Sequence, residues 1–217
     1  MFQRNRIALL AAVLALAAGP CIPAGAQTGG NPIKNILGQA SDNALDQLSK
    51  PGAFSADDAI RIALPGAGKG ISDLMGLANK AGLTGDINGG LNRAAEQAAA
   101  QAKPIFRAAI DKATLRDAAG MVGGSTGATD YLRKSTGPEI VAKLQPLVRT
   151  ALENAGVLRQ TAQLSAIGMT DARLTDYVAN KTSEGIFTYV GREETRMRQN
   201  PLETGKALLN GMKGLKF

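Results

Sequence analysis

The sequence contains no histidine and no tryptophan, and Cys21 is its only cysteine. Histidine is the commonest general base and metal ligand in proteins, and catalytic Ser-His and Cys-His arrangements depend on it. Thiol chemistry and the usual zinc sites need cysteine as well. We therefore expect a protein without catalytic activity, without a metal and without a cofactor.

Aromatic residues and long runs of one charge are also scarce. Aromatic side chains make up 4% of the chain, which leaves little surface on which nucleic-acid bases could stack. The formal net charge is +7, but basic and acidic residues are interspersed and form no basic tail or stripe. Nucleic acid is therefore not an expected partner.

The first 26 residues have the pattern of a secretory signal peptide. Arg4 and Arg6 precede the apolar stretch "IALLAAVLALAAG", and the small residues "AGA" end at Ala26. An apolar run of about thirteen residues is too short for a membrane-spanning helix, which takes about twenty. We expect cleavage after Ala26 and a periplasmic mature chain, residues 27–217, with no transmembrane span.

Cys21 lies inside this segment and could in principle be the lipid-modified first residue of a lipoprotein. Pro20 stands directly before it, where lipoprotein processing requires a small residue, so we do not expect lipid anchoring. Cleavage after Ala26 then leaves a mature chain of 191 residues without a thiol. That length is sufficient for one domain with a hydrophobic core.

Apolar residues of the mature chain recur at intervals of three and four, which indicates helices. We expect a single all-α domain over residues 27–217, built as a compact bundle of about seven to nine helices, several of them short. The predicted helices are Ile33–Leu48, Ile71–Ala81, a helix from Thr84 with a kink at Pro104, two helices separated at Gly137–Pro138, Asp171–Gln199, and one from Leu202. Between Ser55 and Leu64 the pattern fits either a short helix or an extended arm.

The stretch "LPGAGKGISDL", residues 64–74, resembles a phosphate-binding loop. That motif requires a glycine five residues before Gly68 and a hydroxyl residue after Lys69, but Ala63 and Gly70 occupy these positions. We predict a turn that leads into a helix.

Five polar residues on predicted helices form the candidate polar site: Asn92, Arg93, Glu96, Glu193 and Arg198. Asn92 and Glu96 lie one turn apart, either on a solvated flank or facing a partner. Glu193 follows Ile186 and Val190 on an apolar stripe. If that stripe is buried, Glu193 needs a partner, for which we propose Arg93; otherwise the helix end has emerged into solvent. Arg198 and Glu194 are spaced for an ordinary surface ion pair.

Several motifs occur together and in order: "LSKPGAF", "IRIALP", "LNRAAEQA", "AKPIF", "TLRDA", "ATDYL", "YVANK", "EGIF" and "REETRMRQNP". Together they resemble the bacterial domain-of-unknown-function family 4197, from about Asp46 to the C-terminus. The resemblance implies a secreted or envelope helical domain and assigns no activity.

We therefore expect a periplasmic, non-catalytic binding or interaction module with an unknown envelope protein as its partner. The alternative is a carrier for a lipid or another apolar small molecule. Adaptable methionines and a glycine-rich loop could line its cavity. The residues concerned are Met75, Met121, Met169, Met197 and the loop Gly123–Gly127.

Overall fold

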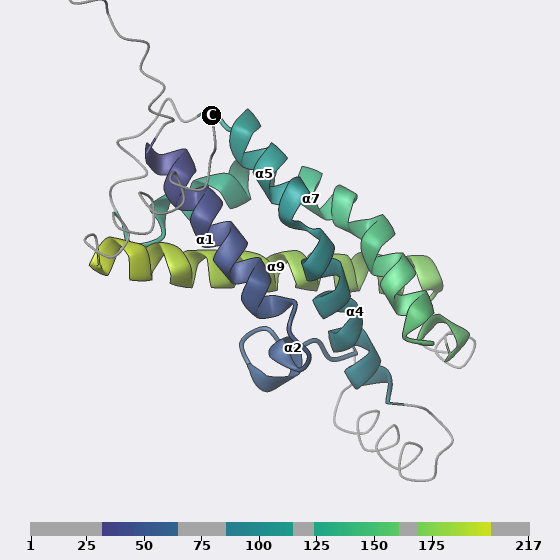
Figure 1. Cartoon of the computed structure of the whole chain (residues 1–217). Coiled ribbons are helices and arrows are strands. Elements are labelled where there is room, and N and C mark those ends of the chain that lie inside the picture. Colours follow the sequence, from purple (N-terminus) through teal and green to yellow (C-terminus); the bar gives the residue numbers. More distant parts are fainter. Residues whose placement is uncertain (1–31, 65–85, 115–123, 161–168, 201–217) are drawn as a thin grey trace, which may run out of the picture. The chain divides into compact units, whose positions relative to one another are not determined.

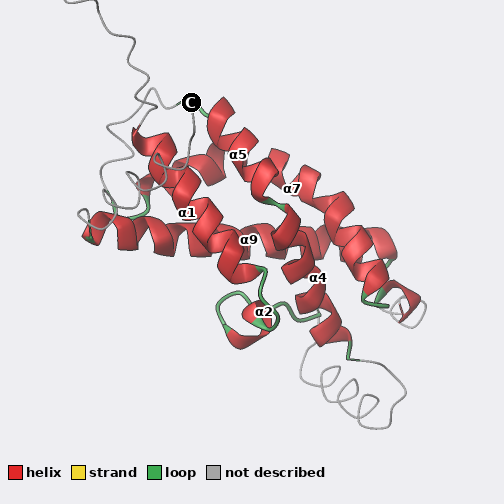
Figure 2. Ribbon diagram, in the orientation of Figure 1, coloured by secondary structure: helices red, strands yellow, loops and turns green. Residues whose placement is uncertain are grey.

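The computed structural model describes residues 32–64, 86–114, 124–160 and 169–200, and every regular element in these ranges is helical (Figures 1 and 2). The all-α prediction is confirmed. The elements are α1 (Pro32–Leu48), α2 (Ala53–Ala56), α4 (Ile87–Gln101), α5 (Lys103–Lys112), α7 (Gly127–Asn154), the 3-10 turn η1 (Leu158–Gln160) and α9 (Asp171–Gln199). The described residues thus hold six α-helices, fewer than the seven to nine expected. The predicted signal peptide, the Lys69 loop, the helix Ile71–Ala81 and the helix from Leu202 lie outside them.

α9 is the central element of the described helices, all of which belong to one compact unit that begins at Asn31. Its largest interfaces are with α7 and α1, and α4 packs mainly on α7 (Figure 1). The predicted bounds of α9 agree with the structure. The helix begins after Thr170, whose hydroxyl accepts the Arg173 N–H at 3.3 Å, and it ends before Asn200 and Pro201.

The predicted break at Gly137–Pro138 does not occur. α7 runs through both residues and also through Pro146. A buried stripe continues across the expected break, because its members lie four residues apart on one face. These members are Leu132, Thr136, Ile140, Leu144 and Val148. Thr136 donates its hydroxyl to the Leu132 carbonyl at 2.7 Å. Burial of this face therefore outweighs the local cost of proline.

Pro104 has a stronger effect than the predicted kink. α4 ends at Gln101, and α5 begins at Lys103 with Pro104 in its first turn, where proline is tolerated. The new helix direction buries Phe106, Ala109 and Ile110, whereas Ile105, the predicted stripe residue, is only partly buried.

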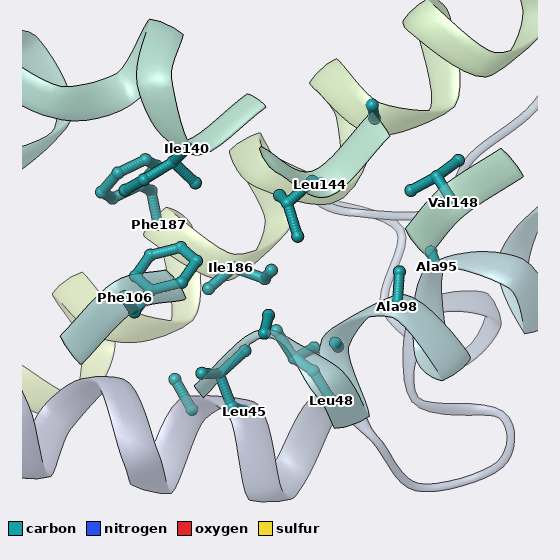
Figure 3. Close-up of a cluster of buried hydrophobic side chains, with 14 of the residues drawn as sticks. Leu45, Leu48, Ala95, Ala98, Phe106, Ile140, Leu144, Val148, Ile186 and Phe187 are labelled. Carbon is teal, nitrogen blue, oxygen red and sulfur yellow. The ribbon is translucent and has the colours of Figure 1, made fainter. Parts of the chain in front are cut away.

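The core lies where α1, α4, α5, α7 and α9 meet (Figure 3). Its largest fully buried side chains include the aromatic residues Phe54, Phe106 and Phe187. Small residues of α4, among them Ala95 and Ala98, allow its neighbours to approach closely. The region after α2 contributes Ile60 and Ile62 to the same core. Of the predicted segment Ser55–Leu64, the first two residues belong to the short helix α2, and residues 61–64 have no regular secondary structure.

Candidate functional site

Two adjacent glutamates near the end of α9 are buried: Glu193 is 7% exposed and Glu194 is 0% exposed. Successive residues of an α-helix point about 100° apart, because 3.6 residues make one turn. The two carboxylates therefore face different neighbours. Glu193 contacts α1, and Glu194 contacts the beginning of α7.

Glu193 lies on the buried stripe, as its spacing predicts, but its predicted partner is wrong. Arg196 donates to its Oε2 at 2.5 Å, and Gln47 of α1 donates to its Oε1 at 2.9 Å. Asn43 donates to Oε2 at 3.4 Å. Arg93 is exposed and forms an ion pair with Asp86 at 3.6 Å. The side chains that reach Glu193 from another helix belong to α1 and not to the helix of Arg93.

These contacts keep Glu193 ionised. Desolvation by burial raises the pKa of its carboxyl group, but the hydrogen bonds from Arg196 and Gln47 together with the charge of Arg196 lower it by more. The net pKa lies below the ordinary glutamate value, so the group carries its charge at neutral pH and ties α9 to α1.

Glu194 and Arg198 do form an ion pair, at 2.6 Å, but it is not the ordinary surface pair predicted. Glu194 Oε2 accepts the Thr129 N–H at 2.8 Å and the Thr129 hydroxyl at 2.6 Å. Its Oε1 accepts the Ala128 N–H at 3.2 Å. The N-cap residue Thr126 makes no capping hydrogen bond. Glu194 therefore supplies from α9 the cap that α7 lacks locally.

Asn92 and Glu96 are buried rather than solvated, with exposures of 3% and 5%. Asn92 Oδ1 accepts the Ile62 N–H at 2.9 Å, and its Nδ2 donates to the Ile62 carbonyl at 2.8 Å. Glu96 Oε1 accepts the Phe54 N–H at 3.2 Å, in the first turn of α2. Both side chains satisfy backbone groups of a segment that has no strand or long helix to pair with.

Replacing Asn92 with alanine is expected to lower the free energy of unfolding by about 1–3 kcal/mol, because the buried N–H and carbonyl of Ile62 lose their partners. Urea denaturation of the purified protein measures this loss. Asn88→Ala is the matched control: among the described residues its exposed side chain accepts the Leu64 N–H alone, and we expect a change within about 0.5 kcal/mol. Equal losses from the two substitutions would contradict this role of Asn92.

The five residues of the candidate polar site therefore do not converge on one place. Asn92 and Glu96 hold the segment after α1 against α4, whereas Glu193 holds α1 and Arg198 supports the cap of α7. Arg93 belongs to neither group. No set of three or more histidine, cysteine, aspartate or glutamate side chains within the described ranges is placed to hold a metal ion.

A further charged cluster joins α9 to the residue that follows α2. Asp57 follows α2 and accepts hydrogen bonds from Arg192 at 2.5 Å and from the Tyr189 hydroxyl at 3.0 Å. The Arg192 guanidinium also lies 4.7 Å from the centre of the Tyr189 ring. The hydrogen bond from Arg192, followed by that from the Ala59 N–H, lowers the pKa of Asp57 to about 2. The spacing of Tyr189 and Arg192 on α9 was visible in the sequence, but their distant partner was not.

Two open grooves lie side by side where α7 packs on α9. The first has a volume of about 390 Å³ and the second about 410 Å³, and Arg133 and Phe187 line both. Val141 and Pro138 give the first groove an apolar wall. Threonines dominate the second, with Thr126, Thr129, Thr188 and Thr195 among its lining residues. None of the residues of the candidate polar site lines either groove.

The family model for proteins of unknown function designated DUF4197 matches residues 24–213, which is most of the chain. The chain belongs to the DUF4197 family. The resemblance found in the sequence motifs is thereby confirmed.

Comparison of this DUF4197 protein with curated proteins and with solved structures returned no match. None of the helices in the described part of the DUF4197 domain combines the length and apolarity needed to cross a lipid bilayer.

Proposed function

We propose that this DUF4197 protein is a non-catalytic binding module of the bacterial periplasm, which receives a segment of a partner protein along the α7–α9 grooves. The observation that carries the proposal is the pair of adjoining grooves with mixed apolar and polar walls. A groove open along a helix pair suits an extended chain, whereas a carrier for an apolar molecule needs an enclosed cavity.

The packing of the two helices against each other supports the proposal. α7 is capped by Glu194 of α9, and the two helices share the largest interface in the described residues. A pre-organised surface loses little conformational freedom on binding, which favours affinity. The candidate polar residues hold α1, α2 and α4 in place around the same helix pair.

Site-specific photocrosslinking in bacteria tests the proposed function. A benzophenone amino acid is placed at Val141 or Thr188, one in each groove, and at the exposed Gln97 of α4 as the control. We expect the same discrete protein adduct from Val141 and Thr188 and none from Gln97. Adducts at all three positions, or at neither groove position, would contradict the proposal. Lipid attached at the groove positions would establish the carrier alternative instead.

The proposed periplasmic location leads to a separate prediction about the mass of the mature protein. The protein extracted from cells should have the mass of residues Gln27–Phe217, because "AGA" presents small residues to signal peptidase. Intact-mass spectrometry of the periplasmic fraction measures it. Replacing Ala24 and Ala26 with bulky residues should block this cleavage. A species that begins at a lipid-modified Cys21 would place the protein on a membrane and contradict the prediction.

A further inference from the structure

The first of the two grooves has a positive charge at one end. The guanidinium carbon of Arg133 lies 5.3 Å from the centre of the Phe187 ring, and Phe187 is only 2% exposed. Arg133 is exposed and forms no ion pair with another residue of the described ranges. A guanidinium that stacks on a ring keeps its in-plane N–H groups available, and their fork matches a carboxylate.

The opposite end of the same groove has a negative charge. Asp176 of α9 is exposed, and its Oδ1 accepts the side-chain amides of Gln145 at 2.9 Å and Asn180 at 3.2 Å. All three residues line the first groove. Both donors are neutral, and no lysine or arginine within the described part of the chain forms a salt bridge with Asp176. The carboxylate charge is therefore not neutralised, and a basic group complements it.

The two charges lie along one face of α9. Its lining residues Asp176, Asn180, Ser183 and Phe187 recur at positions i, i+4, i+7 and i+11, and Arg133 stacks on the last of them. Eleven residues of a helix span about 16 Å. Because the Debye length is about 8 Å at physiological ionic strength, each end of the groove attracts its own counter-charge. The first groove as a whole is thus neither acidic nor basic but has one end of each sign.

Two other carboxylates line the grooves. Glu184 is paired with Lys181 at 2.7 Å, so the two charges cancel. Asp130 lines only the second groove and accepts the Thr126 hydroxyl at 2.9 Å. It precedes Arg133 by three residues on α7, and its charge weakens the attraction of Arg133 for an acid. We therefore expect the charge preference at Arg133 to be smaller than that at Asp176.

Between its two ends the groove has an open floor and an unused hydroxyl. Gly137 is buried, but a Cβ atom built on it would meet no atom of another element within 4 Å. Ser183 is 4% exposed, lines the groove and makes no hydrogen bond to another described residue. A buried hydroxyl without a partner is uncommon in proteins. The main chain of a ligand can lie close to a glycine, and its amide groups can pair with the Ser183 hydroxyl.

We propose that the first groove binds an extended segment of the partner protein that carries one basic and one acidic residue. The basic side chain lies on Asp176 and the acidic side chain on Arg133, while the main chain crosses Gly137 and pairs with Ser183. Residues on one side of an extended chain are an even number apart at about 3.3 Å each, so the two charged residues are four or six positions apart. This inference rests on the proposed function and names the chemistry that the groove recognises.

A peptide library with both ends blocked tests the inference without knowledge of the partner. The mature protein is immobilised and incubated with acetylated, amidated decapeptides that carry Lys, Gln or Glu at each of two positions, four or six residues apart. We expect peptides with one Lys and one Glu, in one of the two orders, to be enriched about tenfold over peptides with Gln at both positions. Each exposed pair contributes about threefold, and two distant pairs act independently. The enrichment should decline in high salt.

Three substitutions in the groove separate its parts. Asp176→Asn should remove the preference for Lys and leave that for Glu, and Arg133→Gln should do the opposite. Gly137→Leu should abolish peptide binding, because the new side chain fills the floor of the groove, where a Cβ atom has room. Melting curves establish that each variant is folded.

Glu153→Gln and Arg159→Gln are the matched controls, because both residues are exposed and lie outside both grooves. They remove the same charges and should leave the enrichment unchanged. The inference would be overturned by enrichment of peptides with two Lys or two Glu residues, by no enrichment at all, or by a preference that survives both Asp176→Asn and Arg133→Gln. Peptide binding that persists in Gly137→Leu would overturn it as well. In each of these cases groove adducts in the crosslinking experiment would still support a binding module.

Discussion

Replacing Glu194 with alanine is expected to lower the free energy of unfolding by about 3 kcal/mol or more, which is a large part of the stability of a typical domain. The carboxylate is fully buried, and its loss leaves the Thr129 N–H and hydroxyl and the Ala128 N–H without their acceptor. It also removes the ion pair with Arg198, whose side chain is 28% exposed. Urea denaturation followed by far-ultraviolet circular dichroism measures the loss.

Glu184→Ala is the matched control on the same helix. Glu184 pairs with Lys181, but its side chain is 64% exposed, and we expect a change within about 0.5 kcal/mol. Glu193→Ala should fall between the two, since Arg196 is 62% exposed and remains solvated when its partner is removed. A loss from Glu194→Ala no larger than that from Glu184→Ala would show that the contacts with Ala128 and Thr129 do not stabilise the fold.

Replacing Phe106 with alanine should lower the free energy of unfolding by about 3–5 kcal/mol. The side chain is 0% exposed, and its ring packs against that of Phe187. The substitution removes this contact and leaves a cavity between α5 and α9, where neighbouring side chains have little room to collapse. Differential scanning calorimetry and urea denaturation measure the change.

The neighbouring residue serves as the control for Phe106. Ile105 is only partly buried, and Ile105→Ala should cause a clearly smaller loss. Phe106→Leu retains most of the apolar volume and should recover much of the stability. Equal losses from Phe106→Ala and Ile105→Ala would mean that the contact between the two rings does not define the core.

Several helix bounds could be predicted from local signals alone. Thr170 before the periodic region and "NP" after Gln199 mark the ends of α9, and the structure has the same bounds. Pro51 and Gly52, which follow α1, are residues typical of a turn, and Gly52 adopts a left-handed backbone with φ 85°. These signals act within a few residues of the chain, so no knowledge of distant contacts was needed.

α7 shows where local signals fail. Glycine and proline at positions 137 and 138 predict a boundary from backbone preference. The apolar stripe that includes Leu132 and Ile140 is buried both before and after these two residues. This burial keeps the helix continuous across them. Its four-residue spacing was present in the sequence, but only packing against α4 and α9 gives it energetic weight.

For the polar residues near the end of α9, too, the sequence predicted some features correctly and others wrongly. Helical spacing alone placed Glu193 on a buried stripe and Glu194 one turn before Arg198, and both placements are correct. The partner of Glu193 and the burial of Glu194 were predicted wrongly. Each depends on which helix lies across this end of α9, and the spacing of residues along one helix carries no information on that.

The sequence by itself determined the helical class, the end of α1, both bounds of α9 and the family, because periodicity, capping residues and ordered motifs are local properties of the chain. Only the tertiary structure decided that Glu194 caps α7 and that Asn92 binds the main chain at Ile62. The stacking of Arg133 on Phe187 was decided there too. These contacts join residues far apart in sequence, and they exist because burial of apolar surface sets the angle at which helices cross.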